Sequence, residues 1–151
     1  MRVDLRELRR TTNGYQRKSA VIDINLYSNM KKILFIEDEP SLQKTVGDIL
    51  KQEGFSILQA TDGEDGVRVA KLEKPNLILL DLILPKIDGF DVIKELKKDP
   101  ETKDLKIIVL TNLQSSGDIE KAIELGATTY LVKANYDLDE IVYKIKEVLG
   151  V

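Results

Sequence analysis

Five polar residues lie directly after short apolar segments or one position further on, and their side chains are the candidates for chemistry in this sequence. They are Glu37, Asp38, Asp81, Thr111 and Lys133. Asp81 is the clearest signal, because it lies between Leu77–Leu80 and Leu82–Pro85. An unpaired carboxylate in such apolar surroundings is costly and needs a partner or a cation. We therefore interpret Asp81 as a functional carboxylate rather than as an ordinary turn residue.

Glu37 and Asp38 form an adjacent acidic pair, and clustered carboxylates repel one another unless a cation neutralises them. Carboxylate oxygens together with retained waters suit Mg²⁺. Lys133 can pair with Asp81, and the Thr111 hydroxyl can donate a hydrogen bond at the same site. A carboxylate can attack phosphorus to form an acyl phosphate, a transfer that depends mainly on alignment and charge neutralisation. The residue types therefore favour a Mg²⁺-dependent phosphoryl transfer onto Asp81.

Short strands and amphipathic helices must position these side chains. Strands are expected at 33–36, 55–60, 77–80, 107–110 and 129–132, and helices after Pro40, Gly63, Gly89, Ser116 and Asp137. The first, third and fourth strands are apolar throughout. Strands that are apolar throughout are typical of a parallel sheet covered by helices on both faces. The alternation predicts an α/β fold with a five-stranded, doubly wound parallel sheet. In such sheets functional groups gather beyond the carboxyl ends of the strands, where the polar residues above stand.

The composition describes one folded domain and excludes several kinds of chemistry. The chain has 151 residues, of which 42% are hydrophobic and 32% are charged. It contains neither Cys nor His, so disulfides, Cys-based zinc sites and Ser-His-Asp catalysis are excluded. Any phosphohistidine donor must therefore be another molecule. No apolar segment approaches the roughly 20 residues that span a bilayer, and the N-terminus lacks a signal-peptide pattern, so we expect a cytoplasmic protein without membrane insertion.

Residues 1–30 differ in charge from the rest of the chain. They contain six Lys and Arg against three Asp and Glu, whereas the remainder contains 17 against 23. An acidic main domain argues against direct binding of nucleic acid. We expect residues 1–30 to form a poorly ordered N-terminal extension, with a weak strand pattern at 21–26, and residues 31–150 to form the main domain.

The chain from Lys31 to Gly150 resembles the receiver domain of two-component response regulators. The matching segments are Ile33–Pro40, Leu79–Pro85 with Asp88 and Gly89, Val109–Thr111, and Gly126–Ala127 with Tyr130–Lys133. Four motifs in the same order make this match more specific than any one of them alone. The resemblance implies a flavodoxin-like sheet with strand order 2-1-3-4-5. Because no output domain follows Val151 in the sequence, we expect the single-domain type that acts in chemotaxis or in a phosphorelay.

The resemblance also implies roles for individual residues. Asp81 resembles the phospho-acceptor, and Asp38 the direct ligand of Mg²⁺. Glu37 would hold the ion through water, and the backbone carbonyl of Ile83 would complete the metal shell together with Asp81. Lys133 would pair with Asp81 at rest and with a phosphoryl oxygen after transfer.

A switch pair and two kinds of partner follow from the same resemblance. Thr111 would move toward the phosphoryl group, and Tyr130 would turn inward behind it. This would change the surface formed by residues 117–149, where a downstream protein target would bind. The donor would be a histidine kinase or a histidine phosphotransfer protein. The domain would catalyse only its own phosphorylation and dephosphorylation, so we do not expect an enzyme with a separate substrate.

Three departures from the family pattern lead to further expectations. Lys133 is followed by Ala134 where the family usually has Pro, and a cis bond without Pro costs roughly 3–4 kcal/mol. We therefore predict a trans or strained peptide there and a shifted Lys133 loop. Asn112 is larger than the usual small residue and is expected to restrict access of the phosphoryl donor. Ile83 and Leu113 are apolar at positions that flank the attacking water, which favours a long-lived phosphoryl group.

Other classes of protein fit the sequence less well. Haloacid-dehalogenase-like phosphohydrolases place a second Asp two residues after the nucleophile, whereas Asp81 is followed by Leu82 and Ile83. A nucleotide-binding protein needs a Gly-rich loop after the first strand, and residues 37–40 offer none. The remaining alternative is a pseudo-receiver, which would be a constitutive protein-interaction module that is never phosphorylated.

Overall fold

A computed structural model describes residues 2–4, 21–23 and 29–151, and the chain divides into two compact units, Met1–Met30 and Lys31–Val151. In the first unit, β1 (Arg2–Asp4) pairs with β2 (Val21–Asp23) in antiparallel orientation. The strand expected at 21–26 is seen over β2, and its remaining residues lie outside the described part. The expectation of a poorly ordered extension stays a prediction, because most of residues 1–30 also lie outside it.

The second unit contains a five-stranded sheet in which every neighbouring pair is parallel. Its strands are β3 (Lys32–Ile36), β4 (Ser56–Ala60), β5 (Leu77–Leu80), β6 (Lys106–Thr111) and β7 (Thr129–Val132). Their spatial order is β4-β3-β5-β6-β7, which confirms the predicted order 2-1-3-4-5 for this sheet. The register aligns Ile36 with Leu80 and Thr111 with Val132. The strands therefore end at one rim, just before Glu37, Asp81 and Lys133.

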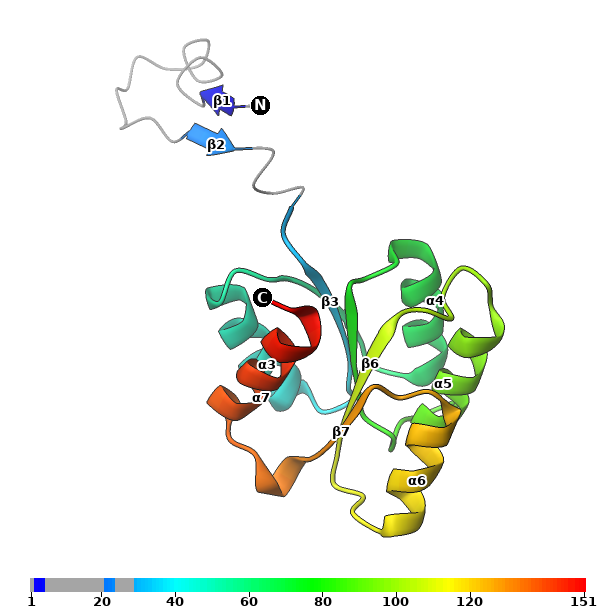
Figure 1. Cartoon of the computed structure of the whole chain (residues 1–151). Helices are drawn as coiled ribbons and strands as arrows, with labels where there is room; N and C mark the ends of the chain where they lie inside the picture. The colour runs from blue at the N-terminus through cyan, green and yellow to red at the C-terminus, as the bar shows by residue number, and fades with distance from the viewer. Residues whose placement is uncertain (1, 5–20, 24–28) are drawn as a thin grey trace. The chain divides into compact units, whose positions relative to one another are not determined.

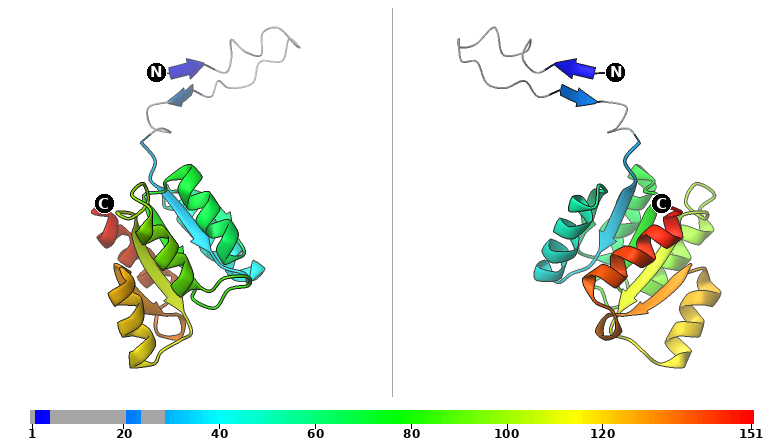
Figure 2. Two further views of the ribbon diagram at one scale, coloured as in Figure 1. Left: turned by 90° about the vertical axis from the view of Figure 1, so that its right-hand side faces the viewer. Right: turned by 60° about the vertical axis from the view of Figure 1, so that its left-hand side comes forward.

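Helices cover both faces of the sheet, as the doubly wound prediction requires. They are α3 (Pro40–Gln52), α4 (Gly63–Glu73), α5 (Gly89–Lys98), α6 (Ser116–Leu125) and α7 (Leu138–Leu149). Figures 1 and 2 show α3 and α7 on one face and α4, α5 and α6 on the other. Each layer is held by its own apolar core. Along β3, Ile33 and Phe35 belong to the core under α3 and α7, whereas Leu34 and Ile36 belong to the opposite one.

Side-chain caps fix where four of these helices begin. The capping residues are Asp62, Asp88, Ser115 and Asp137, and each accepts a hydrogen bond from a backbone N–H three residues later. Asp137 and Glu140 form a reciprocal capping box at α7. Such caps satisfy backbone donors that the first helical turn leaves free. Consequently each helix starts at a defined distance from the strand before it, which fixes the intervening loops at the rim.

The loop between β5 and α5 packs directly against the start of α4. The Gly63 N–H donates a 3.3 Å hydrogen bond to the Pro85 carbonyl, and a Cβ on Gly63 would overlap the Ile87 carbonyl oxygen. Lys86 has a φ of +69° in this loop and lies 3.4 Å from Asp62. A glycine at position 63 therefore permits the close approach that holds the loop following Asp81.

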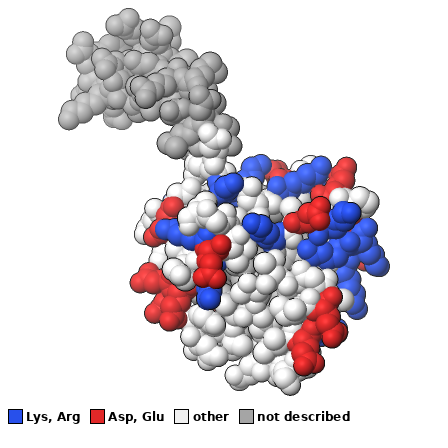
Figure 3. Space-filling model, in the orientation of Figure 1, with Lys and Arg blue, Asp and Glu red and all other residues white. Residues whose placement is uncertain are grey.

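Charged side chains of both signs share the surface of the second unit. On the face drawn in Figure 3, Lys and Arg gather over α4 and α5, with Asp and Glu among them. Ion pairs at the carboxyl ends of these helices include Lys71 with Asp99 at 3.7 Å and Lys74 with Glu101 at 3.3 Å. This face therefore carries no basic stripe of a single sign. Among the described residues, no helix is long and apolar enough to cross a membrane.

Candidate functional site

The carboxyl rim of the sheet brings a lysine against two buried carboxylates. Lys133 Nζ lies 2.9 Å from Asp81 Oδ2 and 3.2 Å from both carboxylate oxygens of Glu37. Asp81 is 5% exposed and Glu37 1% exposed. Three strand ends contribute these residues, because Glu37 follows β3, Asp81 follows β5 and Lys133 follows β7. The predicted convergence of these residues is therefore what the structure shows.

A third carboxylate completes an acidic cluster beside this lysine. One carboxylate oxygen from each of Glu37, Asp38 and Asp81 lies within 4.8 Å of the others. Asp38 is exposed while the other two are buried. Three hard oxygen donors, one of them open to water, are the kind of site that Mg²⁺ prefers, because this ion keeps several of its waters. The residues therefore fit a divalent cation.

The shifted pKa values in the acidic cluster also favour the binding of a cation. Burial raises the pKa of Glu37 to about 7, and a hydrogen bond to Asp81 together with its negative charge adds to the rise. Burial also acts to raise the pKa of Asp81, but hydrogen bonds from Glu37, Lys133 and Thr111 hold it below its usual 3.8. One lysine is shared between two carboxylates, so Glu37 holds a proton more readily than a free carboxyl group does, and a second cation would oppose this. The lowered pKa of Asp81 favours its ionised form at neutral pH.

The start of the β5–α5 loop holds the other oxygen of Asp81. The Ile83 backbone N–H donates a 3.2 Å hydrogen bond to Asp81 Oδ1. Ile83 itself is 56% exposed. The structure therefore places the Ile83 backbone next to Asp81, while the role of its carbonyl as a metal ligand stays a prediction.

The two predicted switch residues meet at the loop after β6. Thr111 is fully buried at the end of β6, and its Oγ1 accepts a long hydrogen bond of 3.5 Å from the Leu113 N–H. The Tyr130 hydroxyl, half-buried on β7, donates a 2.7 Å hydrogen bond to the Leu113 carbonyl. Leu113 thus contacts both members of the pair. Sequence reasoning considered Leu113 only as a neighbour of the attacking water and missed this connection.

The peptide after Lys133 is trans, as predicted, since the described residues contain no cis peptide bond. Lys133, Ala134 and Asn135 form a short 3₁₀ helix that the sequence did not indicate. The expected shift of this loop relative to the family pattern stays a prediction. In the structure Lys133 reaches both Asp81 and Glu37 from this position.

Gln43 was absent from the residues singled out in the sequence. It is buried in α3 and donates hydrogen bonds to backbone carbonyls at the ends of β3 and β4. A signal was present, because Gln43 lies three residues before Val46 and seven before Leu50, on the apolar face of the helix. A polar residue on such a face needs a buried hydrogen-bond partner.

The structure is a flavodoxin-like fold, a doubly wound parallel sheet with an acidic cluster and a lysine at its carboxyl edge. The sequence model of the family described as "Response regulator receiver domain" matches residues 33–146. The chain therefore belongs to the receiver domain family of two-component response regulators, and the resemblance stated from the sequence is confirmed.

Curated relatives of two kinds match this chain. The "Probable transcriptional regulator ycf27" of Cyanophora paradoxa is 41% identical over 70% of this chain and 43% of its own length. The "DNA-binding dual master transcriptional regulator RpaA" of Synechocystis is 37% identical over 80% of this chain and 49% of its own. The chain thus spans about half the length of these relatives. "Protein PilH" of Pseudomonas aeruginosa is 34% identical over 69% of this chain and 86% of its own length.

Solved receiver structures superimpose on most of the chain. A CheY-like response regulator receiver domain protein from Methanospirillum hungatei has a TM-score of 0.76 and 26% identity, covering 81% of this chain and 95% of its own. The receiver domain of sensor histidine kinase PA1611 from Pseudomonas aeruginosa has a TM-score of 0.74 and 28% identity, covering 81% and 99%. That structure contains a magnesium ion coordinated in its active-site cleft.

Proposed function

We propose that this chain is a phospho-acceptor switch that takes a phosphoryl group onto Asp81 from a histidine kinase or a histidine phosphotransfer protein. The observation that carries the proposal is the contact of Lys133 Nζ with Asp81 Oδ2 at 2.9 Å, beside the carboxylates of Glu37 and Asp38. The arrangement supplies a buried ionised nucleophile, a fixed cation and donors for a divalent ion in one place. Phosphoryl transfer requires mainly this positioning and charge neutralisation.

The transfer step forms one bond and breaks one bond. A carboxylate oxygen of Asp81 attacks phosphorus, and the bond between phosphorus and the donor's imidazole nitrogen breaks. The electron pair of that bond stays on the nitrogen, which takes a proton from solvent. Lys133 leaves its pairing with Asp81 for a phosphoryl oxygen and so stabilises the charge that arrives. The donor histidine belongs to the partner, because this sequence has none.

A Mg²⁺ ion would be held by Asp38 and Asp81 directly, by the Ile83 carbonyl, and by Glu37 through water. When bound, it neutralises charge on the phosphoryl oxygens and on the acidic cluster. The raised pKa of Glu37 supports this assignment, since the cluster has more carboxylate than Lys133 alone can neutralise. The chain acts on itself in this scheme and has no separate substrate.

The output of the switch is a change in the surface formed by residues 117–149. Thr111 would follow the phosphoryl group, and Tyr130 would adjust behind it through Leu113, which contacts both. A downstream protein would bind this surface. We also propose a cytoplasmic location, no direct binding of nucleic acid, and residues 31–150 as the receiver domain with 1–30 as a separate extension.

Intact mass after incubation with acetyl phosphate tests the proposal. We expect one phosphoryl adduct with Mg²⁺, none with EDTA, and none in Asp81→Asn under either condition. Phosphoramidate serves as a smaller donor, because Asn112 directly follows Thr111 and is exposed. If neither donor gives an adduct on the wild-type chain, the pseudo-receiver is the better description, and constitutive binding through residues 117–149 becomes the function to examine.

A further inference from the structure

Gln43 is a buried amide directly behind the turn that carries the acidic pair. It is 4% exposed and belongs to the first turns of α3, with its side chain directed at the carboxyl ends of β3 and β4. Its Nε2 lies 3.0 Å from the Phe35 carbonyl oxygen, 3.0 Å from that of Glu37 and 2.9 Å from that of Ala60. One side chain thus links the last residues of two strands to the turn.

The orientation of this amide follows from its surroundings. Three carbonyl oxygens face the nitrogen, so the opposite orientation would set the side-chain oxygen against three acceptors. The Oε1 atom is buried and has no hydrogen-bond partner among the described residues. Leaving a buried acceptor unpaired is costly. The fold tolerates this cost at Gln43, which points to a role for the NH₂ group that an apolar residue would not fill.

The turn between β3 and α3 has few other anchors. Glu39 is the N-cap of α3, but its side chain makes no capping hydrogen bond and instead accepts one from Ser41 Oγ. The Glu37 N–H donates to the Ala60 carbonyl at 3.0 Å, and the Glu37 carbonyl accepts from Gln43. Both ends of the Glu37 residue are therefore fixed, one by β4 and the other by Gln43.

We propose that Gln43 is a positioning residue that presents Glu37 and Asp38 to the divalent cation. This inference rests on the proposed function. The Glu37 carbonyl belongs to the peptide that joins Glu37 to Asp38, so the bond from Gln43 sets the direction in which both carboxylates leave the backbone. Groups that orient metal ligands in this way commonly change metal affinity when they are replaced. Loss of the amide leaves the fold in place and loosens the acidic pair.

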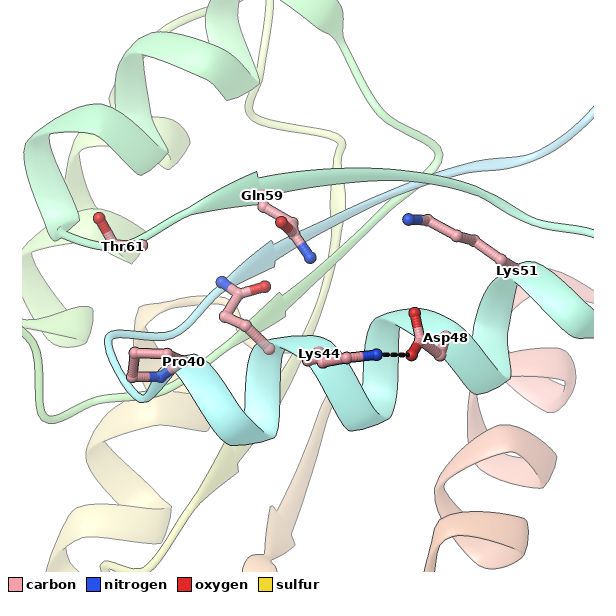
Figure 4. A pocket seen from close by; sticks show the side chains of 7 residues that line it. Pro40, Lys44, Asp48, Lys51, Gln59 and Thr61 are labelled. Carbon is pink, nitrogen blue, oxygen red and sulfur yellow. Dashed lines mark hydrogen bonds and ion pairs between the residues drawn. The ribbon is translucent and has the colours of Figure 1, made fainter.

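The cleft beside Gln43 offers a matched control. It has a volume of about 390 Å³, and its lining includes Gln43, Gln59 and Thr61. Figure 4 shows Gln59 on β4 facing α3, where Lys44 pairs with Asp48. Gln59 is exposed, and the three carbonyls described above accept their amide hydrogen bonds from Gln43. Replacing either glutamine by leucine removes one side-chain amide from this cleft. Only the replacement of Gln43 also removes the hydrogen bond to the Glu37 carbonyl.

Mg²⁺ titration of the full chain tests the inference, with binding followed by the amide signals of Glu37 and Asp38 in NMR spectra. Gln43→Leu should raise the dissociation constant for Mg²⁺ by about tenfold, whereas Gln59→Leu should leave it within about twofold of the wild-type value. A second readout separates positioning from a general structural defect. With acetyl phosphate, Gln43→Leu should need more Mg²⁺ for its half-maximal rate, while the rate at saturating Mg²⁺ stays near that of wild type.

The Mg²⁺ affinities of the wild type and of Gln43→Leu test the proposed function and the role of Gln43 separately. Equal Mg²⁺ affinity in wild type and Gln43→Leu would overturn the role of Gln43 and leave the proposed function standing. A variant that loses thermal stability without any change in Mg²⁺ affinity would overturn it too. If Gln43→Leu does not fold, the same titration is done with Gln43→Met, which keeps the length of the side chain but lacks the amide hydrogen-bond donors. Failure of the wild type itself to bind Mg²⁺ would overturn the proposed function and with it the role of Gln43.

Discussion

The Tyr130 hydroxyl donates a 2.7 Å hydrogen bond to the Leu113 carbonyl, so β7 is tied to the loop that follows β6. The same Leu113 donates its N–H to Thr111 Oγ1. A displacement of Thr111 toward a phosphoryl group would therefore alter the residue that Tyr130 holds. Burial raises the pKa of Tyr130 to about 12, with the charges of Asp118 and Asp81 adding to it, so the hydroxyl stays a donor at neutral pH.

Replacing Tyr130 by Phe should uncouple this link without disturbing the chemistry at Asp81. The ring remains, and the lost hydrogen bond should lower the free energy of unfolding by about 1 kcal/mol. The rate of phosphorylation by acetyl phosphate should stay within about threefold of wild type, because Asp81 is held by Lys133 and the Ile83 N–H rather than by Tyr130. Urea unfolding and intact-mass kinetics measure the two effects. A rate as low as that of Asp81→Asn would show that Tyr130 belongs to the chemistry instead.

The raised pKa of Glu37 predicts a pH-dependent stability in the metal-free protein. Burial and Asp81 move this pKa from 4.5 to about 7 in the folded state, so the folded protein binds more protons than the unfolded chain within that window. Stability should therefore fall as pH rises from about 4.5 to 7, by at most roughly 3 kcal/mol. The lowered pKa of Asp81 affects stability only near and below pH 3.8. The raised pKa of Lys133 affects stability only above pH 10.5.

Denaturant unfolding between pH 5 and pH 8, with EDTA present, measures this slope. Glu37→Gln is the control, because an amide cannot titrate and its slope should be smaller. Mg²⁺ should stabilise the wild type more at pH 8 than at pH 5, since the cation binds the ionised cluster. Stability that is flat or rising across this range in the metal-free wild type would contradict the assignment.

The sequence predicted the sheet and the residues at its rim because both depend on local pattern. Apolar strands such as Leu77–Leu80 are buried on both faces, and the residue after each strand in a parallel sheet falls on one edge. Knowing that Asp81 follows such a strand was therefore enough to place it. The order of the strands was confirmed as well, although it came with the family resemblance rather than from periodicity.

What the sequence could not supply were contacts that depend on side-chain direction. The bonds from Gln43 to carbonyls of β3 and β4 need the exact packing of α3 on the sheet. Lys133 is the first residue of the short 3₁₀ helix after β7, and there it contacts both Asp81 and Glu37. Spacing marks Gln43 as a polar residue on an apolar helix face, but it does not say which carbonyls the side chain reaches. Both sets of contacts therefore appear only when the elements are packed.

Lys86 offers a prediction about the loop that follows Asp81. Its φ of +69° is a left-handed conformation that costs a non-glycine residue roughly 1–2 kcal/mol. Its ammonium group lies 3.4 Å from Asp62 and 3.9 Å from Glu64, but exposed ion pairs of this kind contribute only about 0–1 kcal/mol. Lys86→Gly should therefore be at least as stable as wild type.

Lys86→Ala is the matched control, because it loses the same ion pairs and keeps the unfavourable φ. We expect the glycine variant to exceed the alanine variant by about 1 kcal/mol in urea unfolding. The difference between the two variants measures the free-energy cost of the positive φ alone, because both variants lose the ion pairs of Lys86. An alanine variant as stable as the glycine variant would mean that the loop relaxes around position 86 when the lysine is removed.

Apolar residues in the loops after Asp81 and after Thr111 predict a long-lived phosphoryl group. Ile83 is 56% exposed and its N–H bonds to the Asp81 carboxylate, and Leu113 is half-buried in the loop after Thr111. Neither side chain can donate or accept a hydrogen bond, so neither can hold a water molecule in line with the phosphorus–oxygen bond to Asp81. Ile83→Asn introduces an amide at the rim and should shorten the lifetime several-fold, whereas Ile83→Leu should leave it unchanged. Intact mass after removal of excess acetyl phosphate follows the decay, and a wild-type half-life of seconds would show that water is positioned by other groups.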